Sequence, residues 1–522
     1  MACSKIFSGD LPELINEIIQ YFHNDSKTLH SCILVNRLWC RFAIPLLWED
    51  PFSIKFLKNY HFIEIYLHNI NEDDRTKLKE YGIYNELFPS NTLFNYPSFI
   101  QCFDTHKVHI SIHNWIIVNV NSKNELQHSS HFMHNTNLSY NKYKQMFDFT
   151  KLIYRLLLLI FIESEVKLKC FKIKLIIDKD HEIFDSVFEL ILQNPNFICN
   201  IKNLTLDFGK ISDNITKFLM FLYSNCNLIS SLYFTYPYNY NHIVISEKRL
   251  SQIINSQENL RKITLEFNDK DLPCNLLLSL KNTNCLNTLN TIIFYYMDFE
   301  NINILNEVFN QLNVLESVHL IYCQSLDSKF VQKIDGITKS FKLKTLFLRD
   351  ILQIESLVLL IQKFGNYIEN FEVISYNNPQ QLLQLLLESI IKYCTNIKFL
   401  CLIFEPNYEI IHLVINLIKN IKQNLNYLSI HTTISTIRNN FDDYYLDNYL
   451  VFDSIILQNL GQILPSKLEY LNLSLMINNG NDLEVFLKNS QKTFINKLLI
   501  YNKKNEENEE IFFYIKEYIM RK

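Results

Sequence analysis

The stretch Leu343-Lys-Thr-Leu-Phe-Leu348 decides the fold, because close relatives of it recur along most of the chain. Apolar residues occupy its first, fourth and sixth positions. The last two of these have one residue between them, as expected for a β-strand with one buried face. We call the fourth position of each copy its central anchor. The central anchors are Phe171, Leu204, Leu232, Ile263, Ile292, Val318, Leu346, Phe371, Leu400, Leu428, Leu471 and Leu498.

The spacing of these copies indicates a repeat. Successive central anchors are mostly 25–33 residues apart, and one interval of 43 residues separates Leu428 from Leu471. Apolar patterns with helical spacing lie between the strands, for example at 184–192, 215–223, 357–364, 382–393 and 410–418. A chain of 522 residues exceeds one ordinary hydrophobic core, so several domains or an elongated repeat are expected.

The strand pattern and the period together resemble the leucine-rich repeat, whose period is about 20–29 residues. The resemblance implies an α/β fold, a curved solenoid with a parallel sheet inside and helices outside. An irregular α/β domain that merely alternates strands and helices is the alternative. The copies are degenerate, and the asparagine that often follows the strand in such repeats is not regular here.

A second informative stretch precedes the repeats, at residues 10–51. A Leu-Pro pair opens an amphipathic helical pattern whose apolar residues recur at steps of three and four. Asp25 or Ser26 can cap a second helix. A third apolar segment contains Trp39 and reaches Pro45, where we expect an interruption. Three helices this short cannot bury all their apolar surface among themselves, and spare apolar surface indicates a partner.

The order and spacing of these segments resemble an F-box, the helical module that docks substrate receptors onto the Skp-type adaptor of cullin-based ubiquitin ligases. The resemblance covers residues 10–51. It implies a three-helix module whose Leu-Pro pair, first helix and third segment contact the adaptor. The adaptor-binding residues would be Leu11, Pro12, Leu14, Ile18, Leu34, Val35 and Trp39. A plain helical cap over the rest of the chain is the alternative.

These patterns predict four segments along the chain. Residues 1–50 would form the F-box-like module, 51–167 a helical or irregular bridge, and 168–502 the repeats. Residues 503–522 would form a charged spacer and a helix that caps the last repeat, as terminal repeats require. A polar insertion is expected in the bridge near 121–142.

The bridge also contains a group of histidines, which raises the question of a metal site. Its members are His106, His109, His113, His128, His131 and His134. By sequence spacing, His128 and His131 alone suit zinc, and no cysteine pair or carboxylate accompanies them as a closed structural site would require. We therefore predict no metal and no cofactor.

Motifs for catalysis are absent from the sequence. It contains neither a Gly-x-Ser-x-Gly nucleophile elbow nor a His-Glu-x-x-His zinc helix. With only 7 glycines, glycine-rich phosphate-binding loops are not expected. The net charge of −4 argues against nucleic acid as a partner. We expect a protein that is not an enzyme.

The compartment can also be predicted. The longest uninterrupted apolar run, at 156–162, is far shorter than the about 20 residues of a membrane-spanning helix. The first residues lack the apolar segment of a signal peptide. The 12 cysteines include no Cys-x-x-Cys pair and fit reduced thiols. These features favour a cytoplasmic or nuclear protein without membrane contact.

The two resemblances together predict a substrate-recognition subunit of an SCF-type ubiquitin ligase. The F-box would bind the Skp-type adaptor, and through it a cullin, while the repeats bind a target protein. The residue after each central anchor points away from the core, so the concave face is the expected target surface. We expect the target-binding residues to be Tyr233, Ile293, His319, Phe347 and Glu372.

Three other readings stay open at this point. One is a leucine-rich-repeat binding module unrelated to ubiquitin transfer, and a second is a hydrolase inhibitor of the repeat-horseshoe kind. The third is an enzyme whose site residues lie far apart in the sequence. Binding to the adaptor separates the first two from a ligase subunit, and an activity screen addresses the third.

Overall fold

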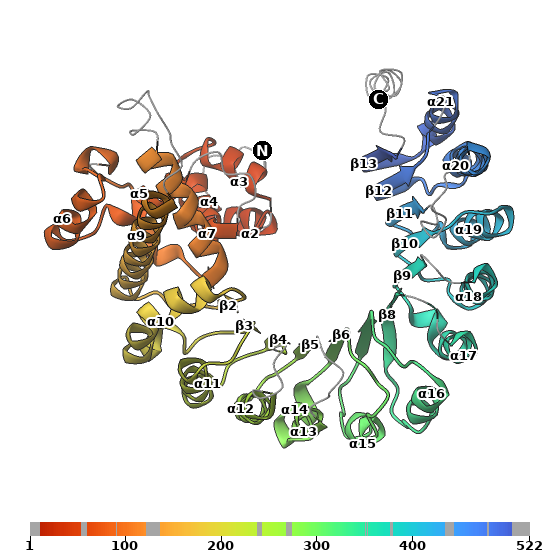
Figure 1. Ribbon diagram of the computed structural model, residues 1–522, viewed down its shortest axis with the longest axis horizontal. Coiled ribbons are helices and arrows are strands. Elements are labelled where there is room, and N and C mark those ends of the chain that lie inside the picture. Colours follow the sequence, from red (N-terminus) through yellow and green to blue (C-terminus); the bar gives the residue numbers. More distant parts are fainter. Residues whose placement is uncertain are drawn as a thin grey trace. The chain divides into compact units, whose positions relative to one another are not determined.

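The protein divides into two compact units, Met1–Arg261 and Lys262–Lys522, which we call the first and the second unit. In each unit of this computed structural model, parallel strands alternate with helices that lie on one side of them (Figure 1). This confirms an α/β fold with parallel strands and helices outside them. The structure describes residues 11–23, 25–53, 60–89, 91–121, 136–236, 243–267, 274–349, 351, 353–375, 379–433, 443–477 and 480–503.

The first unit begins with three short helices, α2 (Pro12–Tyr21), α3 (Ser26–Ile33) and α4 (Arg37–Leu47). The carboxylate of Asp25 caps α3 by accepting a hydrogen bond of 3.1 Å from the backbone N–H of Thr28. Asn36 caps α4 in the same way, with the N–H of Trp39 as donor at 3.0 Å. Helix caps of these residue types explain why the chain separates the three helices at these points.

The prediction that Pro45 interrupts the third helix is wrong, because α4 continues through it to Leu47. A proline removes one backbone N–H from the helix and crowds the carbonyl one turn earlier. Here it lies in the last turn, where few hydrogen bonds remain to be lost.

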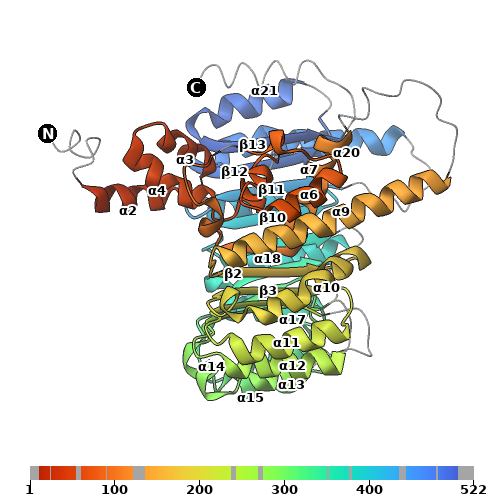
Figure 2. The same ribbon diagram turned by 90° about the vertical axis from the view of Figure 1, so that its left-hand side faces the viewer.

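The bridge that follows combines helices with short turns of 3-10 or π helix. Its elements are η1 (Pro51–Ser53), α5 (Phe62–Leu67), α6 (Glu72–Glu80), η2 (Asn85–Leu87), η3 (Tyr96–Phe99), β1 (Cys102–Asp104), α7 (Thr105–Ile116), η4 (Ile117–Asn121) and α9 (Thr136–Glu163). In Figure 2, α2, α3 and α4 lie to one side of α9. The sequence did not predict β1, which is only three residues long and pairs in parallel with the next strand, so that Phe103 lies beside Phe171.

Three of the predicted strands belong to the first unit. The elements after the bridge are β2 (Cys170–Leu175), α10 (Asp178–Gln193), η5 (Pro195–Phe197), β3 (Asn203–Phe208), α11 (Asp213–Asn225), β4 (Ser231–Thr235) and α12 (Ile243–Ser256). Strands β1 to β4 pair in sequence order and in parallel. Helices α10, α11 and α12 pack side by side beside them (Figure 2).

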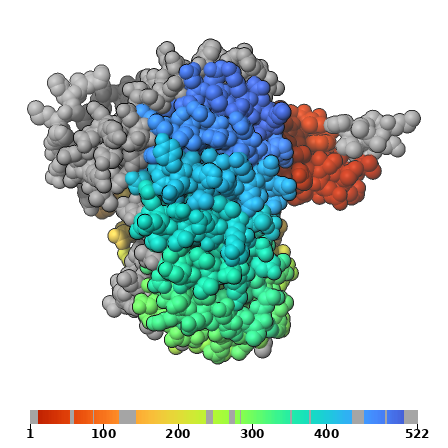
Figure 3. All heavy atoms as spheres, turned by 90° about the vertical axis from the view of Figure 1, so that its right-hand side faces the viewer, coloured from red at the N-terminus to blue at the C-terminus, as the bar shows by residue number. Residues whose placement is uncertain are grey.

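The other predicted strands belong to the second unit. Its elements are β5 (Lys262–Glu266), α13 (Cys274–Ser279), α14 (Thr283–Thr288), β6 (Thr291–Tyr295), α15 (Leu305–Phe309), β7 (Ser317–Ile321), α16 (Ser328–Asp335), β8 (Lys342–Arg349), α17 (Ile354–Phe364), η7 (Gly365–Tyr367), β9 (Asn370–Ser375), α18 (Gln380–Tyr393), β10 (Phe399–Phe404), α19 (Tyr408–Ile421), β11 (Tyr427–Thr432), α20 (Asp443–Ile463), β12 (Lys467–Leu475), α21 (Gly480–Asn489), η8 (Ser490–Lys492) and β13 (Phe494–Asn502). Strands β5 to β13 pair in parallel with their sequence neighbours. Helices α16 to α21 pack in sequence order, and Figure 3 shows their outer side as a continuous surface.

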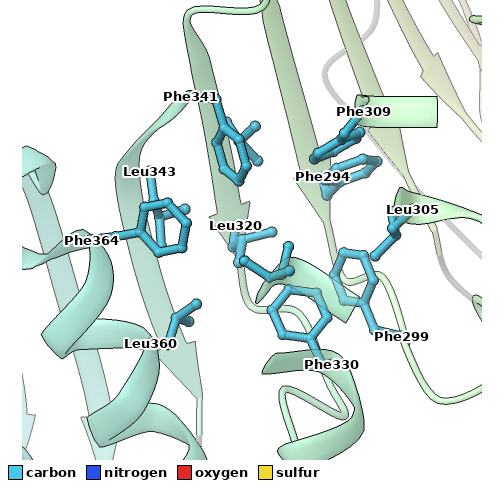
Figure 4. A pocket seen from close by; sticks show the side chains of 12 residues that line it. Phe294, Phe299, Leu305, Phe309, Leu320, Phe330, Phe341, Leu343, Leu360 and Phe364 are labelled. Atoms are coloured by element: carbon cyan, nitrogen blue, oxygen red, sulfur yellow. The ribbon is translucent and has the colours of Figure 1, made fainter. Parts of the chain in front are cut away.

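The core of each unit lies between strands and helices. Every central anchor is buried except Leu498, on the last strand, which is half-buried. Phenylalanine dominates part of the second unit's core, where Phe294, Phe299 and Phe330 face one another (Figure 4). The free space among these side chains is about 10 Å³, which is at the lower limit for one water molecule. This region is therefore packed core and not a ligand pocket.

Some predictions concern residues outside the described parts of the chain. Most of the polar insertion near 121–142 and nearly all of the segment 503–522 with its capping helix lie there. Within the described ranges, no helix combines the length and the apolar character needed to cross a membrane.

Candidate protein-interaction surfaces

Helices α2, α3 and α4 leave several apolar side chains exposed. The exposed fractions are 41% for Leu11, 39% for Leu14, 86% for Leu34 and 45% for Val35. We call these four residues the exposed apolar group. Leu11 and Leu14 lie on one side of the start of α2, and the other two lie in the turn between α3 and α4. Exposed apolar side chains on a small module are typical of a partner-binding site.

The three other predicted adaptor-binding residues are less exposed. Trp39 is only 8% exposed, because it packs inside the small core of the three helices. That core comprises Ile15, Ile19, Leu29, Cys32, Trp39, Ala43 and Leu47. Ile18 packs partly against it, and Pro12 is half-buried. The structure thus separates residues that hold the module together from residues that it presents to solvent.

The end of α4 attaches the module to the bridge. The Trp48 ring packs edge-on against Tyr66 with 5.4 Å between ring centroids, and lies 4.2 Å from the ring of Tyr96. The carbonyl of Glu49 accepts hydrogen bonds from the N–H groups of Gln101, at 3.1 Å, and Cys102, at 3.2 Å. The module is therefore held to the bridge through residues other than the exposed apolar group.

In the second unit, a row of aromatic side chains runs across the strands from β6 to β12, with no member on β9. We call it the aromatic ladder, and it comprises Tyr296, Tyr322, Phe347, Phe399, Tyr427 and Tyr470. Phe399 pairs with Tyr427, and Tyr427 with Tyr470, on β10, β11 and β12. Each of these three residues directly precedes the central anchor of its strand. Because side chains alternate along a strand, the three rings lie on the face opposite the buried core.

The ring geometry of the aromatic ladder follows from the strand spacing. The ring centroids of Phe399 and Tyr427 are 4.3 Å apart, and those of Tyr427 and Tyr470 are 4.4 Å apart with their planes at 4°. These distances are close to the spacing of about 4.8 Å between neighbouring strands. Phe347 extends the row, 5.5 Å from Phe399. At the other end, the ammonium of Lys497 lies 5.2 Å from the centre of the Tyr470 ring.

Two tyrosines that follow β6 and β7 continue the row. Tyr296 and Tyr322 stack with ring centroids 5.5 Å apart, and Tyr322 lies 6.1 Å from Phe347. Both adopt left-handed backbone conformations, with φ of 54° and 53°, which are uncommon for residues other than glycine. The N–H of Tyr296 donates to the carbonyl of Ile321, and the N–H of Tyr322 to that of Phe347, each at 2.9 Å. Equivalent backbone turns in two successive repeats therefore place the two rings together.

Buried and half-buried polar groups lie beside the aromatic ladder. Burial raises the pKa of Glu372, and a hydrogen bond from the hydroxyl of Tyr322 opposes that rise. Nδ1 of His319 lies 2.8 Å from the hydroxyl oxygen of Thr345. Burial, with lesser contributions from nearby lysines, lowers the pKa of His319 to about 4. His319 is therefore uncharged at neutral pH.

A second polar group on this face contains a serine and a histidine, which raises the question of catalysis. Oγ of Ser429 lies 2.8 Å from Nε2 of His431. The side-chain amide of Asn472 lies 3.1 Å from that Oγ and 3.0 Å from the same Nε2. A serine nucleophile needs a base whose lone pair is available to it, whereas the amide N–H groups of Asn472 donate to both atoms. The arrangement suits hydrogen bonding better than activation of Ser429.

The structure places the predicted target-binding residues in three locations. Tyr233 is half-buried on β4 of the first unit. Ile293 lies directly opposite His319 on β6 and β7. Phe347 lies directly opposite Glu372 on β8 and β9.

A register shift separates the two pairs in the second unit. It occurs between Val318 and His319, so that His319 pairs with Thr345 while Phe347 pairs with Ile321. The regular spacing of the central anchors does not reveal this irregularity. Without the shift His319 would lie opposite Lys344, whereas with it the histidine lies opposite its hydrogen-bonding partner Thr345.

Most of the aromatic ladder was not predicted from the sequence. The predicted target-binding residues follow the central anchors, whereas Phe399, Tyr427 and Tyr470 precede theirs. Both positions lie on the same strand face because side chains alternate. The recurrence of an aromatic residue before Leu400, Leu428 and Leu471 was the signal that could have identified them.

Comparison with known proteins yields no assignment, since neither a protein-family model nor a curated protein sequence matches this chain. Any functional conclusion therefore depends on the exposed apolar group and the aromatic ladder.

Proposed function

We propose that this protein is a substrate-recognition subunit of an SCF-type ubiquitin ligase. Its first three helices act as an F-box that binds a Skp-type adaptor, and through the adaptor a cullin. Its strand–helix units act as degenerate leucine-rich repeats that bind a target protein. The observation that carries the proposal is the exposed apolar group, which the protein presents on a module with a separate core of its own.

The division of labour within the three helices suits docking. Trp39 and Ile15 lie in the module's core, where they pack the three helices against one another. Leu34 and Leu11 remain exposed. Protein interfaces take most of their energy from a few anchors that become fully desolvated on binding. An adaptor groove that received these side chains would remove apolar surface that the free protein leaves in water.

The aromatic ladder suits the recognition of a protein target. Aromatic residues are enriched in protein interfaces, where they supply large contact areas with few rotatable bonds. The stacked rings of Phe399, Tyr427 and Tyr470 fix one another before binding, so little conformational freedom would be lost on association. The hydroxyls of the two tyrosines can add hydrogen bonds at the edge of an apolar contact.

A recruiter of this kind needs no catalytic group of its own. Binding the adaptor and the target on one scaffold turns their encounter into a nearly intramolecular event with a high effective concentration. The ubiquitin-loaded conjugating enzyme would supply the chemistry. The exposed apolar group and the aromatic ladder supply the two contacts that this mechanism requires.

Co-purification tests this proposal. Tagged full-length protein, expressed in cells with a Skp-type adaptor and a cullin, should elute with both as one complex in size-exclusion chromatography. The cullin should be absent from the complex when the adaptor is omitted. Elution of the full-length protein alone, under conditions where a known F-box protein carries both partners, would refute the proposal.

A further inference from the structure

The bridge brings two histidines and a carboxylate together, although they are far apart in the sequence. His106 and His109 lie one turn apart on α7, and Asp180 lies in the first turn of α10. One possible ligand atom from each residue lies within 4.8 Å of the others. Nδ1 of His109 is 2.9 Å from Oδ1 of Asp180, and Nδ1 of His106 is 3.5 Å from the same oxygen.

The carboxylate of Asp180 is oriented by the backbone. Asp180 is only 4% exposed, and its Oδ2 accepts hydrogen bonds of 3.3 Å from the N–H groups of Ile176 and Ile177. Its other oxygen, Oδ1, therefore faces the histidines. Hydrogen bonds of this kind, made by the oxygen that does not bind the ion, orient the ligands in metal sites.

Helix α7 is likewise fixed in place. The hydroxyl oxygen of Thr105, at the start of α7, accepts a hydrogen bond of 2.9 Å from the N–H of Lys174 on β2. Two histidines three residues apart on one helix project to the same side. The three side chains are thus held together by the fold and not by a flexible loop.

One nitrogen in this cluster lacks a hydrogen-bond partner among the described residues. Nδ1 of His106 is buried, and at 3.5 Å from Oδ1 of Asp180 it makes no hydrogen bond there. A buried nitrogen without a partner is unfavourable. A cation between the three side chains would use this lone pair together with those of His109 and Asp180.

We propose that His106, His109 and Asp180 bind a divalent transition-metal ion of the zinc class. Two imidazoles and one carboxylate are a common ligand set for such ions. With metal–ligand distances of about 2.1 Å and tetrahedral geometry, the ligand atoms should lie about 3.4 Å apart. The 3.5 Å between Nδ1 of His106 and Oδ1 of Asp180 already fits this value. The 2.9 Å between Nδ1 of His109 and the same oxygen must widen slightly.

The site has room for a fourth ligand. A cavity of about 170 Å³ adjoins it, lined by both histidines and by His113 and Lys179, among others. The ammonium of Lys179 lies 4.2 Å from the centre of the Tyr143 ring. A metal with three protein ligands and one open position can hold a water molecule there. This site is independent of the exposed apolar group and of the aromatic ladder.

Titration of the metal-stripped full-length protein with Co²⁺ tests the site. We expect one equivalent to bind with the visible d–d absorption of tetrahedral Co²⁺ held by nitrogen and oxygen ligands, and without the near-ultraviolet charge-transfer band of cysteine ligation. Zn²⁺ should displace Co²⁺ and raise the thermal unfolding midpoint. His106→Gln and Asp180→Asn should each lower the affinity at least about tenfold.

His61→Gln is the matched control, because Nδ1 of His61 also lies 2.9 Å from a carboxylate oxygen, that of Glu64. It should leave Co²⁺ binding unchanged. His106→Gln is the decisive variant, since it removes no hydrogen bond between described side chains and should fold normally by circular dichroism. Absence of saturable binding, or unchanged affinity in folded His106→Gln, would overturn the proposed metal site.

Discussion

The hydroxyl of Tyr322 donates a hydrogen bond of 2.7 Å to Oε1 of Glu372, which lies fifty residues farther along the chain. This bond links the turn after β7 to the middle of β9. It spans the intervening strand β8, on which Phe347 lies directly opposite Glu372. Glu372 is only 9% exposed, so its carboxylate has little access to water. The bond therefore joins the aromatic ladder to a buried carboxyl group.

Tyr322→Phe should destabilise this part of the second unit. A buried acceptor that loses its donor costs about 1–3 kcal/mol, and the pKa of Glu372 should rise further because the opposing hydrogen bond is gone. The measurement is hydrogen exchange of β8 and β9 amides, followed by mass spectrometry in the full-length protein. Tyr408→Phe, on the exposed side of α19, is the control and should leave that exchange unchanged. Equal protection of these amides from exchange in Tyr322→Phe and the wild type would show that the hydrogen bond does not stabilise β8 and β9.

Asp453 should make the second unit less stable as the pH rises. It is fully buried on α20 and accepts hydrogen bonds from the hydroxyl of Thr432 and the N–H of Met476. Burial raises its pKa from 3.8 to about 6. Between pH 3.8 and pH 6 the folded protein keeps a proton on Asp453 that the unfolded chain has released. The stability that Asp453 contributes is therefore full below pH 3.8 and is lost as the pH rises through 6.

Replacing Asp453 with Asn should remove this pH dependence, because the amide cannot ionise but can still accept both hydrogen bonds. The readout is the urea midpoint, compared between pH 4.5 and pH 7 for the variant and the wild type. Glu409→Gln, at an exposed position on α19, should keep the wild-type dependence. If the urea midpoint of Asp453→Asn changed with pH as much as that of the wild type, a group other than Asp453 would be responsible for the pH dependence.

Trp39→Ala should unfold the three-helix module and not simply weaken a contact. Replacing a buried tryptophan by alanine costs about 3–5 kcal/mol, which is large for a core this small. We expect loss of helical signal and increased proteolysis within residues 11–47. Leu34→Asp changes an exposed residue and should leave both properties unchanged. Normal protease resistance in Trp39→Ala would place the indole outside the module's core.

The aromatic ladder should be needed for target capture but not for adaptor binding. Phe347→Glu combined with Tyr427→Glu places charges within a stacked apolar row, so a protein partner would have to bury them. Proximity labelling in cells should then lose a defined set of neighbours while the adaptor remains. Tyr408→Glu changes an aromatic residue on the helical side that is 64% exposed and should lose none of them. An identical neighbour set in all three proteins would exclude the aromatic ladder as the target surface.

The sequence could predict the strands because their signal is local. In copies such as Leu343 to Leu348, the alternation of apolar residues fixes both the strand and its buried face. Strand β1 has only Cys102 to Asp104 and owes its existence to pairing with β2. The register shift at His319 also depends on tertiary packing, and no local pattern encodes it.

The candidate surfaces were less predictable than the fold. On α2, the apolar stripe was too broad to show that Ile15 and Ile19 would be buried while Leu11 and Leu14 would be exposed. In the metal site, Asp180 lies 71 residues from His109, so spacing within the histidine group gave no indication of it. The sequence pointed instead to His128 and His131, which lie outside the described residues.

Calorimetric titration of the purified full-length protein with a Skp-type adaptor tests the central claim most directly. The wild type should bind, and Leu34→Asp with Val35→Asp should weaken binding by at least about 2 kcal/mol, or roughly 30-fold, as expected for an interface hot spot. Leu93→Asp is the matched control, because Leu93 is 90% exposed in the bridge, and it should bind like the wild type. Failure of the wild type to bind, or equal affinity in the doubly substituted protein, would contradict the proposal that this chain is a ubiquitin-ligase subunit.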